Sequence, residues 1–336
     1  MRTKKLFNNT VKIALPLLLG SAILYWMYRG FDFSSIKHVL LHEMNWTWMI
    51  LSLPFGILAQ AFRGWRWKQS LEPIGEHPRA SVCVNSIFLS YAVSLLIPRI
   101  GEFARCGVLN RYDKIAFPKA IGTVVTERAV DTLIVLLISA TAFLMQIRVF
   151  TNFFSRTGTR IDDVFGMFSP TGWLVTAICG VASIILFYYV LRHLSFYKKV
   201  KEMLGGIWQG VKNIPLFIFY SLAIWGSYFL HYYLTFYCFD ATANLGLSCA
   251  LVSFVVGSVA VIVPTPNGAG PWHFAVKTML ILYGVADNQA LYFVLIVHTT
   301  QTLLVILLGV YAWIALSFTK TPVSLGGPTE LTRPAK

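Results

Sequence analysis

Charge is what this chain has least of, and acidic residues are the scarcest charged type. Its 336 residues include 14 Asp and Glu, and only 12% are charged, whereas soluble domains average roughly 25%. So little charge cannot cover a water-soluble domain of this size, which excludes a soluble enzyme, a nucleic-acid-binding protein and a disordered chain. With 56% hydrophobic residues and a mean hydropathy of +0.65, the composition predicts a protein that crosses a membrane several times.

Enzyme motifs and paired cysteines are also missing. The sequence has no G-x-S-x-G, H-E-x-x-H or Walker motif, so we expect no catalytic residue, no metal site and no cofactor. The five cysteines are odd in number and lack C-x-x-C spacing. They are therefore predicted to be buried small apolar residues rather than a disulfide framework.

Six apolar runs are long enough to cross about 30 Å of hydrocarbon as helices. The first is too long for a signal peptide and ends in aromatic residues, so an uncleaved span is predicted. Two shorter runs, 80–98 and 248–264, contain more small and hydroxyl residues, and each ends at a proline followed by glycine. The six long runs are 11–28, 46–62, 120–147, 171–191, 214–238 and 289–317.

The basic residues indicate whether the two short runs cross the membrane. The chain has 28 Lys and Arg, and basic loops favour the cytoplasm. If run 80–98 turns back within the bilayer, most of the basic residues fall on the cytoplasmic side. This set includes Arg63, Arg66, Lys68 and Arg79.

We therefore predict an all-α polytopic membrane protein with about six full transmembrane helices, two re-entrant helical hairpins that enter from opposite faces, and both termini in the cytoplasm. Eight full spans are the alternative. Residues 1–318 are expected to form one transmembrane domain, and residues 319–336, which are rich in proline and glycine, a flexible cytoplasmic tail.

One cluster of charged residues follows the first short run. Arg99, Glu102 and Arg105 come directly after Pro98 and are spaced three apart, so they would lie near one another on a helix that starts there. Arginine side chains bind phosphate in a bidentate manner, and a helix N-terminus adds free N–H donors. The cluster predicts a phosphate-binding site; a charged helix that simply ends the hairpin is the alternative.

A second charged cluster interrupts an otherwise apolar helix. A charge inside a membrane costs about 2.5–3.5 kcal/mol on insertion scales. Arg128 can pair with Asp131 at i+3, which leaves Glu127 to find a partner such as Arg99 or Arg105 on a neighbouring helix. A structural ion network and a proton- or substrate-coupled site are both consistent with this pattern.

The third cluster is the proline- and glycine-rich segment 264–273, which cannot continue a helix. Broken backbone at membrane depth is tolerated only where it is buried in protein or lines a cavity. In both segments, here and at Pro98, an apolar run ends at a proline, which glycine and a further helix follow. Two such broken segments in opposite orientation are typical of transporters with inverted repeats. The candidate binding residues of this segment are Asn267, Gly268, Gly270 and His273, although a lone histidine is more often structural.

At these three clusters the chain resembles the transmembrane-domain family of lysylphosphatidylglycerol synthases and flippases. The resemblance covers about residues 10–318. It implies a lipid-translocase fold in which six charged residues line or brace the headgroup pathway: Arg99, Glu102, Arg105, Glu127, Arg128 and Asp131. Two departures matter: only a short tail follows the last span, where bifunctional members carry an aminoacyl-transfer domain, and His273 stands where the family often has glutamate.

The resemblance implies a multi-pass translocase of the bacterial inner membrane. Its substrate would be an anionic, aminoacylated or polyprenyl-linked lipid that crosses between leaflets through a cavity between the two hairpins. We expect membrane phospholipid or a lipid-linked substrate as its partner and no nucleic acid; a second copy of the chain or a separate lipid-modifying enzyme is the candidate protein partner. The alternatives are a membrane-embedded enzyme subunit that acts on lipid-linked substrates and a lipid-binding scaffold that transports nothing.

Overall fold

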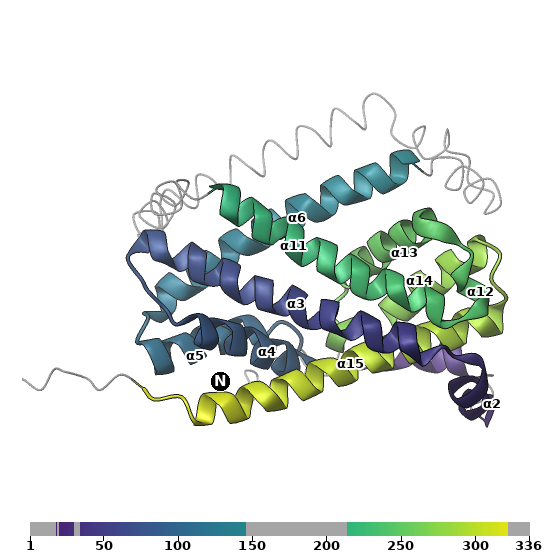
Figure 1. Ribbon diagram of the computed structural model, residues 1–336, viewed down its shortest axis with the longest axis horizontal. Helices are drawn as coiled ribbons and strands as arrows, with labels where there is room; N and C mark the ends of the chain where they lie inside the picture. The colour runs from purple at the N-terminus through teal and green to yellow at the C-terminus, as the bar shows by residue number, and fades with distance from the viewer. Residues whose placement is uncertain (1–17, 19, 30–33, 146–213, 322–336) are drawn as a thin grey trace, which may run out of the picture.

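The computed structural model describes residues 18, 20–29, 34–145 and 214–321, and these residues are helices and short connections (Figure 1). The predicted span 171–191, residues 11–17 and 19 of the predicted span 11–28 and the tail beyond residue 321 lie outside the described residues. The cysteines that fall inside the described ranges are buried and free, as expected for small apolar residues; they are Cys83, Cys106, Cys238 and Cys249.

Four long helices run along the longest axis of the molecule (Figure 1). They are α3 (Trp46–Leu71), α6 (Phe117–Met145), α11 (Ile214–Tyr233) and α15 (Asp287–Ser317). The shortest has 20 residues, about 30 Å at 1.5 Å per residue, which matches the hydrocarbon thickness of a bilayer. By length and composition, α15 could cross a membrane.

Two helical hairpins occupy opposite ends of this bundle (Figure 1). The first comprises α4 (Ala80–Leu96) and α5 (Gly101–Asp113), and the second α13 (Gly246–Ala260) and α14 (Pro271–Leu282). Each hairpin enters from its own end, breaks near the middle of the molecule and returns to the same end. All four helices have 17 residues or fewer, about 26 Å at most, which is shorter than a full span.

The remaining described elements are short and connect the helices. A helix covers residues 20–28, and Asn45 caps α3 by accepting a hydrogen bond from the Thr47 amide at 3.1 Å. The others are α2 (Ser34–His38), η1 (Val39–Glu43), η2 (Glu72–Ile74), η4 (Leu234–Cys238), α12 (Asp240–Ala243) and η5 (Pro266–Gly268).

Each hairpin packs into a hydrophobic core of its own. Around the first hairpin, Trp67 and Leu71 of α3 pack with Ile87 and Leu109. Around the second, apolar residues of α13 and α14 pack against α15 and η4, where Phe236 lies beside other aromatic rings. The two cores leave the middle of the molecule, where the hairpins meet, to polar side chains.

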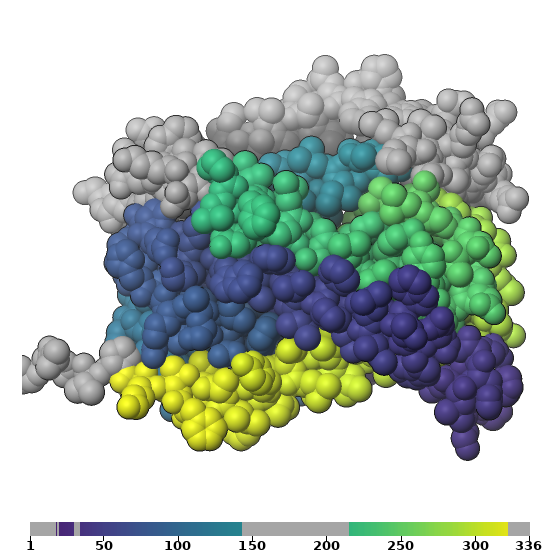
Figure 2. All heavy atoms as spheres, viewed as in Figure 1, coloured from purple at the N-terminus to yellow at the C-terminus, as the bar shows by residue number. Residues whose placement is uncertain are grey.

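The surface of the long helices is apolar. Large hydrophobic residues are exposed along α6, α11 and α15, among them Leu136, Leu222 and Leu307. Figure 2 shows α15 along one edge of the molecule and α3 beside α11 across the visible face. Apolar residues outside and charged residues inside are typical of a protein surrounded by lipid. For the described residues the all-helical fold is thus confirmed, whereas the number of full spans and the side of the termini stay predictions.

Candidate functional site

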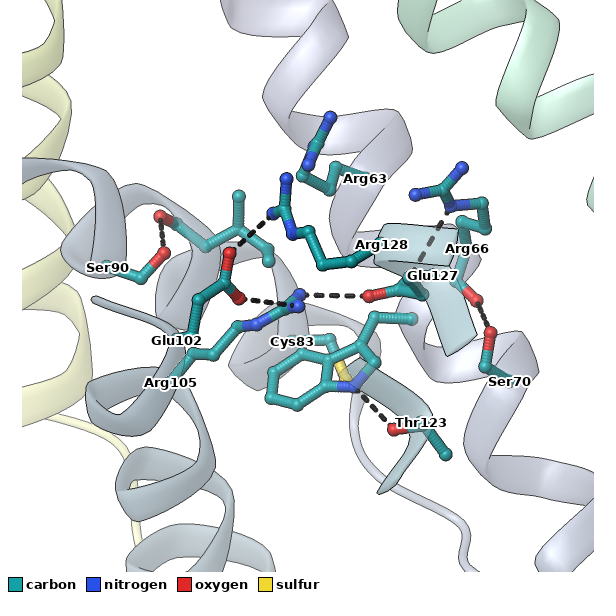
Figure 3. A network of polar contacts seen from close by, with 12 residues as sticks. Arg63, Arg66, Ser70, Cys83, Ser90, Glu102, Arg105, Thr123, Glu127 and Arg128 are labelled. Atoms are coloured by element: carbon teal, nitrogen blue, oxygen red, sulfur yellow. Dashed lines mark hydrogen bonds and ion pairs between the residues drawn. The ribbon is translucent and has the colours of Figure 1, made fainter. Parts of the chain in front are cut away.

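A chain of ion pairs joins α3, α5 and α6 inside the bundle (Figure 3). Helix α3 contributes Arg63 and Arg66, α5 contributes Glu102 and Arg105, and α6 contributes a short charged sequence. That sequence supplies Glu127, Arg128 and Asp131. Four arginines thus face three carboxylates, which leaves the group with one positive charge in excess.

The distances place most members of this network between two partners. Glu127 receives Arg105 Nη1 on Oε2 at 3.0 Å and Arg66 Nε on Oε1 at 3.4 Å. Asp131 receives Arg66 Nη1 at 2.8 Å and Arg63 Nη1 at 3.2 Å. Glu127 therefore joins α6 to both α3 and α5, and Asp131 joins α6 to α3.

Aromatic rings complete the surroundings of these arginines. The guanidinium carbon of Arg105 lies 4.5 Å from the ring centroid of Trp67, whose indole N–H donates to Thr123 Oγ1 at 2.9 Å. The guanidinium carbon of Arg63 lies 5.8 Å from the Tyr228 ring centroid. Ring faces attract cations most strongly where water is excluded, so these contacts help to hold the two guanidinium groups in place.

The network has a buried end and an open end. The side chains of Arg105 and Glu127 are 1% exposed, whereas those of Glu102 and Arg128 are 28% and 42% exposed. The open end is joined to the buried end because Glu102 binds Arg105 at 2.8 Å and Arg128 at 2.7 Å. Only the open end can meet a ligand directly.

Two sequence-based predictions about α3 are corrected here. Arg63 and Arg66 were expected in a cytoplasmic loop after a span that ends at residue 62. Helix α3 instead continues to Leu71, and these two side chains are 3% and 0% exposed within the bundle. They balance the carboxylates of α6, so they do not contribute to the charge of a loop.

The tips of the two hairpins meet in the middle of the molecule. At each tip a residue other than glycine adopts the left-handed conformation: Arg99 with φ of 65° and Asn267 with φ of 51°. Such a conformation costs of order 1–3 kcal/mol and often marks a functional site. The Arg99 guanidinium crosses to the second hairpin and donates to the Ile262 carbonyl at 3.1 Å. Arg99 therefore lies in the turn before α5, not on the helix where it was expected beside Glu102 and Arg105, and it forms no ion pair with Glu102.

A cavity of about 390 Å³ lies between the hairpin tips, within the usual size range of small-molecule sites. Its charged lining residues are Arg99, Glu102 and Arg128. Apolar, aromatic and uncharged polar residues from the long helices and from both hairpins complete the wall. These include Gln60, Tyr91, Tyr228, His231, Trp272, His298 and Gln301.

Hydrogen bonds between the second hairpin and α15 hold the other wall of the cavity. Asn267 Nδ2 donates to Thr302 Oγ1 at 2.8 Å, and His298 Nε2 donates to the Asn267 carbonyl at 3.1 Å. Thr302 Oγ1 also lies 3.4 Å from His298 Nδ1. A neutral imidazole satisfies both contacts of His298, so this wall needs no charge.

The predicted site residues thus fall into three groups. Those that line the cavity are Arg99, Glu102, Arg128, Asn267 and Gly268. Arg105, Glu127 and Asp131 lie in the network behind it. Gly270 and His273 belong to the second hairpin but do not line the cavity; the His273 ring is 3% exposed and lies 4.3 Å from the His298 ring.

Sequence reasoning missed several residues of the site. Gln60, Arg63 and Arg66 form a polar stripe at helical spacing on α3, and this stripe was a usable signal. The polar segment 298–302 inside the apolar α15 was another. Tyr91 and Tyr228, whose hydroxyls lie 3.0 Å apart, left no comparable signal, because tyrosine is common throughout this chain.

A helical bundle with an apolar surface, two opposed broken hairpins and a cavity that includes charged lining residues is typical of a membrane protein. The family model for the lysylphosphatidylglycerol synthase TM region matches residues 13–309, and the chain belongs to this family. The predicted family is thereby confirmed. The comparisons with curated proteins and with solved structures give no match.

Proposed function

We propose that the protein is a multi-pass lipid translocase of the bacterial inner membrane. The observation that carries this proposal is the cavity between the hairpin tips, since it places Arg99 and Arg128 at the centre of a bundle whose outer surface is apolar. A phosphate-bearing headgroup would enter this polar interior while its acyl chains remain in lipid.

The two arginines have different roles in this proposal. Arg99 lies at a hairpin tip, and its guanidinium donates one hydrogen bond, to the backbone of the opposite hairpin, and forms no ion pair within the described residues, so it can turn towards a phosphate. Arg128 stays paired to Glu102 and donates through its remaining N–H groups. Arg105, which lies in the buried network, holds α5 in place and does not touch the headgroup.

The movement would need the hairpin tips to separate. The described polar side-chain contact between them is the hydrogen bond from Arg99 to Ile262, and a phosphate that binds Arg99 would replace it. The proposal includes no chemical change of the lipid, and the headgroup crosses intact.

Fluorescent phospholipids in proteoliposomes test this function. A reductant that cannot cross the membrane bleaches the outer-leaflet probe, and protein-dependent loss of the inner-leaflet signal measures translocation. We expect Arg99→Ala to slow this loss about tenfold, the effect of one charge-assisted hydrogen bond. Arg111→Ala, an exposed arginine at the far end of α5 and outside the cavity, is the matched control.

The same proteoliposomes also distinguish a translocase from the two alternatives, an enzyme subunit and a scaffold. A lipid whose mass changes during incubation would indicate a membrane-embedded enzyme subunit. Lipid binding without movement, in protein that remains monodisperse, would indicate a scaffold. Equal rates for Arg99→Ala and the wild type at equal protein content would overturn the assignment of Arg99 to the pathway.

A further inference from the structure

The charge balance of the cavity lining restricts the kind of headgroup that fits. The one carboxylate that lines the cavity, among the described residues, is Glu102. Both of its oxygens are engaged, Oε2 with Arg105 Nη2 at 2.8 Å and Oε1 with Arg128 Nη2 at 2.7 Å. A cationic headgroup would have to compete with two arginines for this carboxylate, so the cavity offers no free carboxylate to an ammonium group.

The positive charges of the cavity are less well balanced. Arg99 forms no ion pair with the described residues and is held by one backbone carbonyl. Arg128 shares Glu102 with Arg105 and lies 3.6 Å from Asp131, an aspartate that Arg63 and Arg66 already bind. The lining and the network behind it both carry net positive charge, which favours an anion in the cavity.

Among the uncharged side chains of the cavity wall that the structure describes, two buried polar atoms lack a hydrogen-bond partner. They are Gln60 Oε1 and Thr265 Oγ1, in side chains that are 3% and 5% exposed. An unpaired buried polar group is costly, and such groups are commonly completed by a ligand or water. The amide oxygen of Gln60 accepts hydrogen bonds and needs a donor, which a phosphodiester lacks and an alcohol hydroxyl supplies.

We infer that the cavity selects an anionic phosphate ester whose headgroup also carries a hydroxyl group, and that it discriminates against aminoacylated headgroups with a net positive charge. This inference rests on the proposed function for the lipid nature of the ligand. Arg99 and Arg128 bind the phosphate, and Gln60 and Thr265 bind the hydroxylated part. Selection arises because an ammonium group finds two arginines and no free carboxylate.

Three headgroups in lipid nanodiscs and proteoliposomes test the selection. Phosphatidylglycerol is anionic and hydroxylated, phosphatidic acid is anionic without an alcohol headgroup, and lysyl-phosphatidylglycerol is cationic. We expect phosphatidylglycerol to be enriched on the purified protein and moved fastest, with lysyl-phosphatidylglycerol at least about tenfold slower. Soluble glycerol 3-phosphate at the same concentration should not compete; effective competition would show that the site takes a free phosphate ester.

Substitutions separate the two parts of the site. Arg99→Gln should lower phosphatidylglycerol binding about tenfold, and Arg99→Lys, which keeps the charge, should restore part of it. Gln60→Leu should reduce the preference of the protein for binding phosphatidylglycerol over phosphatidic acid. Arg111→Gln is the control for both, because this arginine lies outside the cavity.

The outcomes distinguish this inference from the proposed function. If no lipid moves but nanodisc enrichment follows the expected order, translocation is wrong and the selectivity stands. If lysyl-phosphatidylglycerol binds or moves at least as well as phosphatidylglycerol, the selectivity is wrong and translocation stands. If phosphatidylglycerol is enriched equally on the wild type, Arg99→Gln and Gln60→Leu, the cavity is not the site that selects it.

Discussion

Arg66 shows how strongly one residue can depend on its partners. Its side chain is fully buried, with Asp131 at 2.8 Å, Glu127 at 3.4 Å and the Ser221 hydroxyl at 3.0 Å. Burying a charge is expensive, and loss of one partner leaves the others uncompensated. The side chain is therefore a structural requirement of the bundle, even though it does not reach the cavity.

We predict that Arg66→Met destabilises the protein by about 3–5 kcal/mol. Thermal unfolding of the purified protein in detergent, followed by loss of the monodisperse peak, measures the change. Arg111→Met, at an exposed position, should unfold at the wild-type temperature.

A double substitution shows whether the ion pairs cause this loss. Arg66→Met combined with Asp131→Asn should be less destabilised than the sum of the two single variants, because the neutral amide no longer needs Arg66. Additive losses would contradict the pairing and would assign the effect to packing.

At the scale of single residues, the sequence predicted ion pairs between residues close in the sequence better than ion pairs between residues far apart. The spacing of Arg128 and Asp131 predicted their contact, observed at 3.6 Å, and the expected partner of Glu127 on a neighbouring helix is Arg105. The contacts of Arg66 with α6 span 61 residues, and the rotation of α3 about its axis decides them. The rotation of a helix depends on its packing against other helices and cannot be inferred from a single sequence. The arginines of α3 were therefore predicted to lie in a loop.

At the scale of elements, the first hairpin depends on a close approach of α5 to α4. A Cβ atom at Gly101 would lie 2.1 Å from the Ser90 carbonyl oxygen and 2.3 Å from Ser94 Oγ. Ser90 is in the middle of α4, so its backbone cannot move aside without bending that helix. Glycine at position 101 therefore sets the distance between the two helices.

Gly101→Ala should destabilise the protein by roughly 1–3 kcal/mol, as overpacking does, and should slow translocation because α5 carries Glu102. Gly107→Ala is a matched control on the same helix, since a Cβ there meets nothing within 4 Å. It should leave the unfolding temperature unchanged or raise it slightly through better helix propensity. Thermal unfolding of both variants checks the prediction, which fails if Gly101→Ala behaves like the control.

The tip of the second hairpin gives a further prediction. Asn267 has a positive φ and a side-chain hydrogen bond to Thr302. Asn267→Gly keeps the conformation and removes the bond, whereas Asn267→Ala loses both. In thermal unfolding in detergent, we expect the wild type to have the highest unfolding temperature, Asn267→Gly a lower one and Asn267→Ala the lowest. An alanine variant more stable than the glycine variant would show that the conformation carries no strain.

The sequence predicted the break in each hairpin, but the residues that it matched between the two breaks do not correspond in the structure. Pro98 and Pro264 had seemed to correspond because glycine follows each of them. The backbone instead makes Arg99 the counterpart of Asn267, and hence Pro98 the counterpart of Pro266, because these two are the residues other than glycine that have positive φ at the two tips. Proline and glycine show where a helix ends, but the left-handed residue within the break depends on packing between the tips.

For the whole molecule, the arrangement of the hairpins decides how the chain lies in a membrane. The described helices place the start of α4 and the end of α5 at one end of the bundle, and the start of α13 and the end of α14 at the other (Figure 1). Charge counting in the sequence predicted two re-entrant hairpins in this way. Moving Arg63 and Arg66 out of the loop leaves this topology prediction unchanged, because the many other basic residues in the sequence determine it.

Single cysteines test this topology in a variant whose native cysteines are replaced. His77 precedes α4, Arg111 is in the last turn of α5, and both are exposed; Asn244 and Asn288 flank the second hairpin and are also exposed. We predict that a membrane-impermeant maleimide labels His77→Cys and Arg111→Cys from one side of the membrane, and Asn244→Cys and Asn288→Cys from the other, in sealed vesicles of known orientation. Labelling after detergent treatment is the control for reactivity. Eight full spans would place His77 and Arg111 on opposite sides, so opposite labelling of this pair would contradict the re-entrant hairpin and the central position of the cavity.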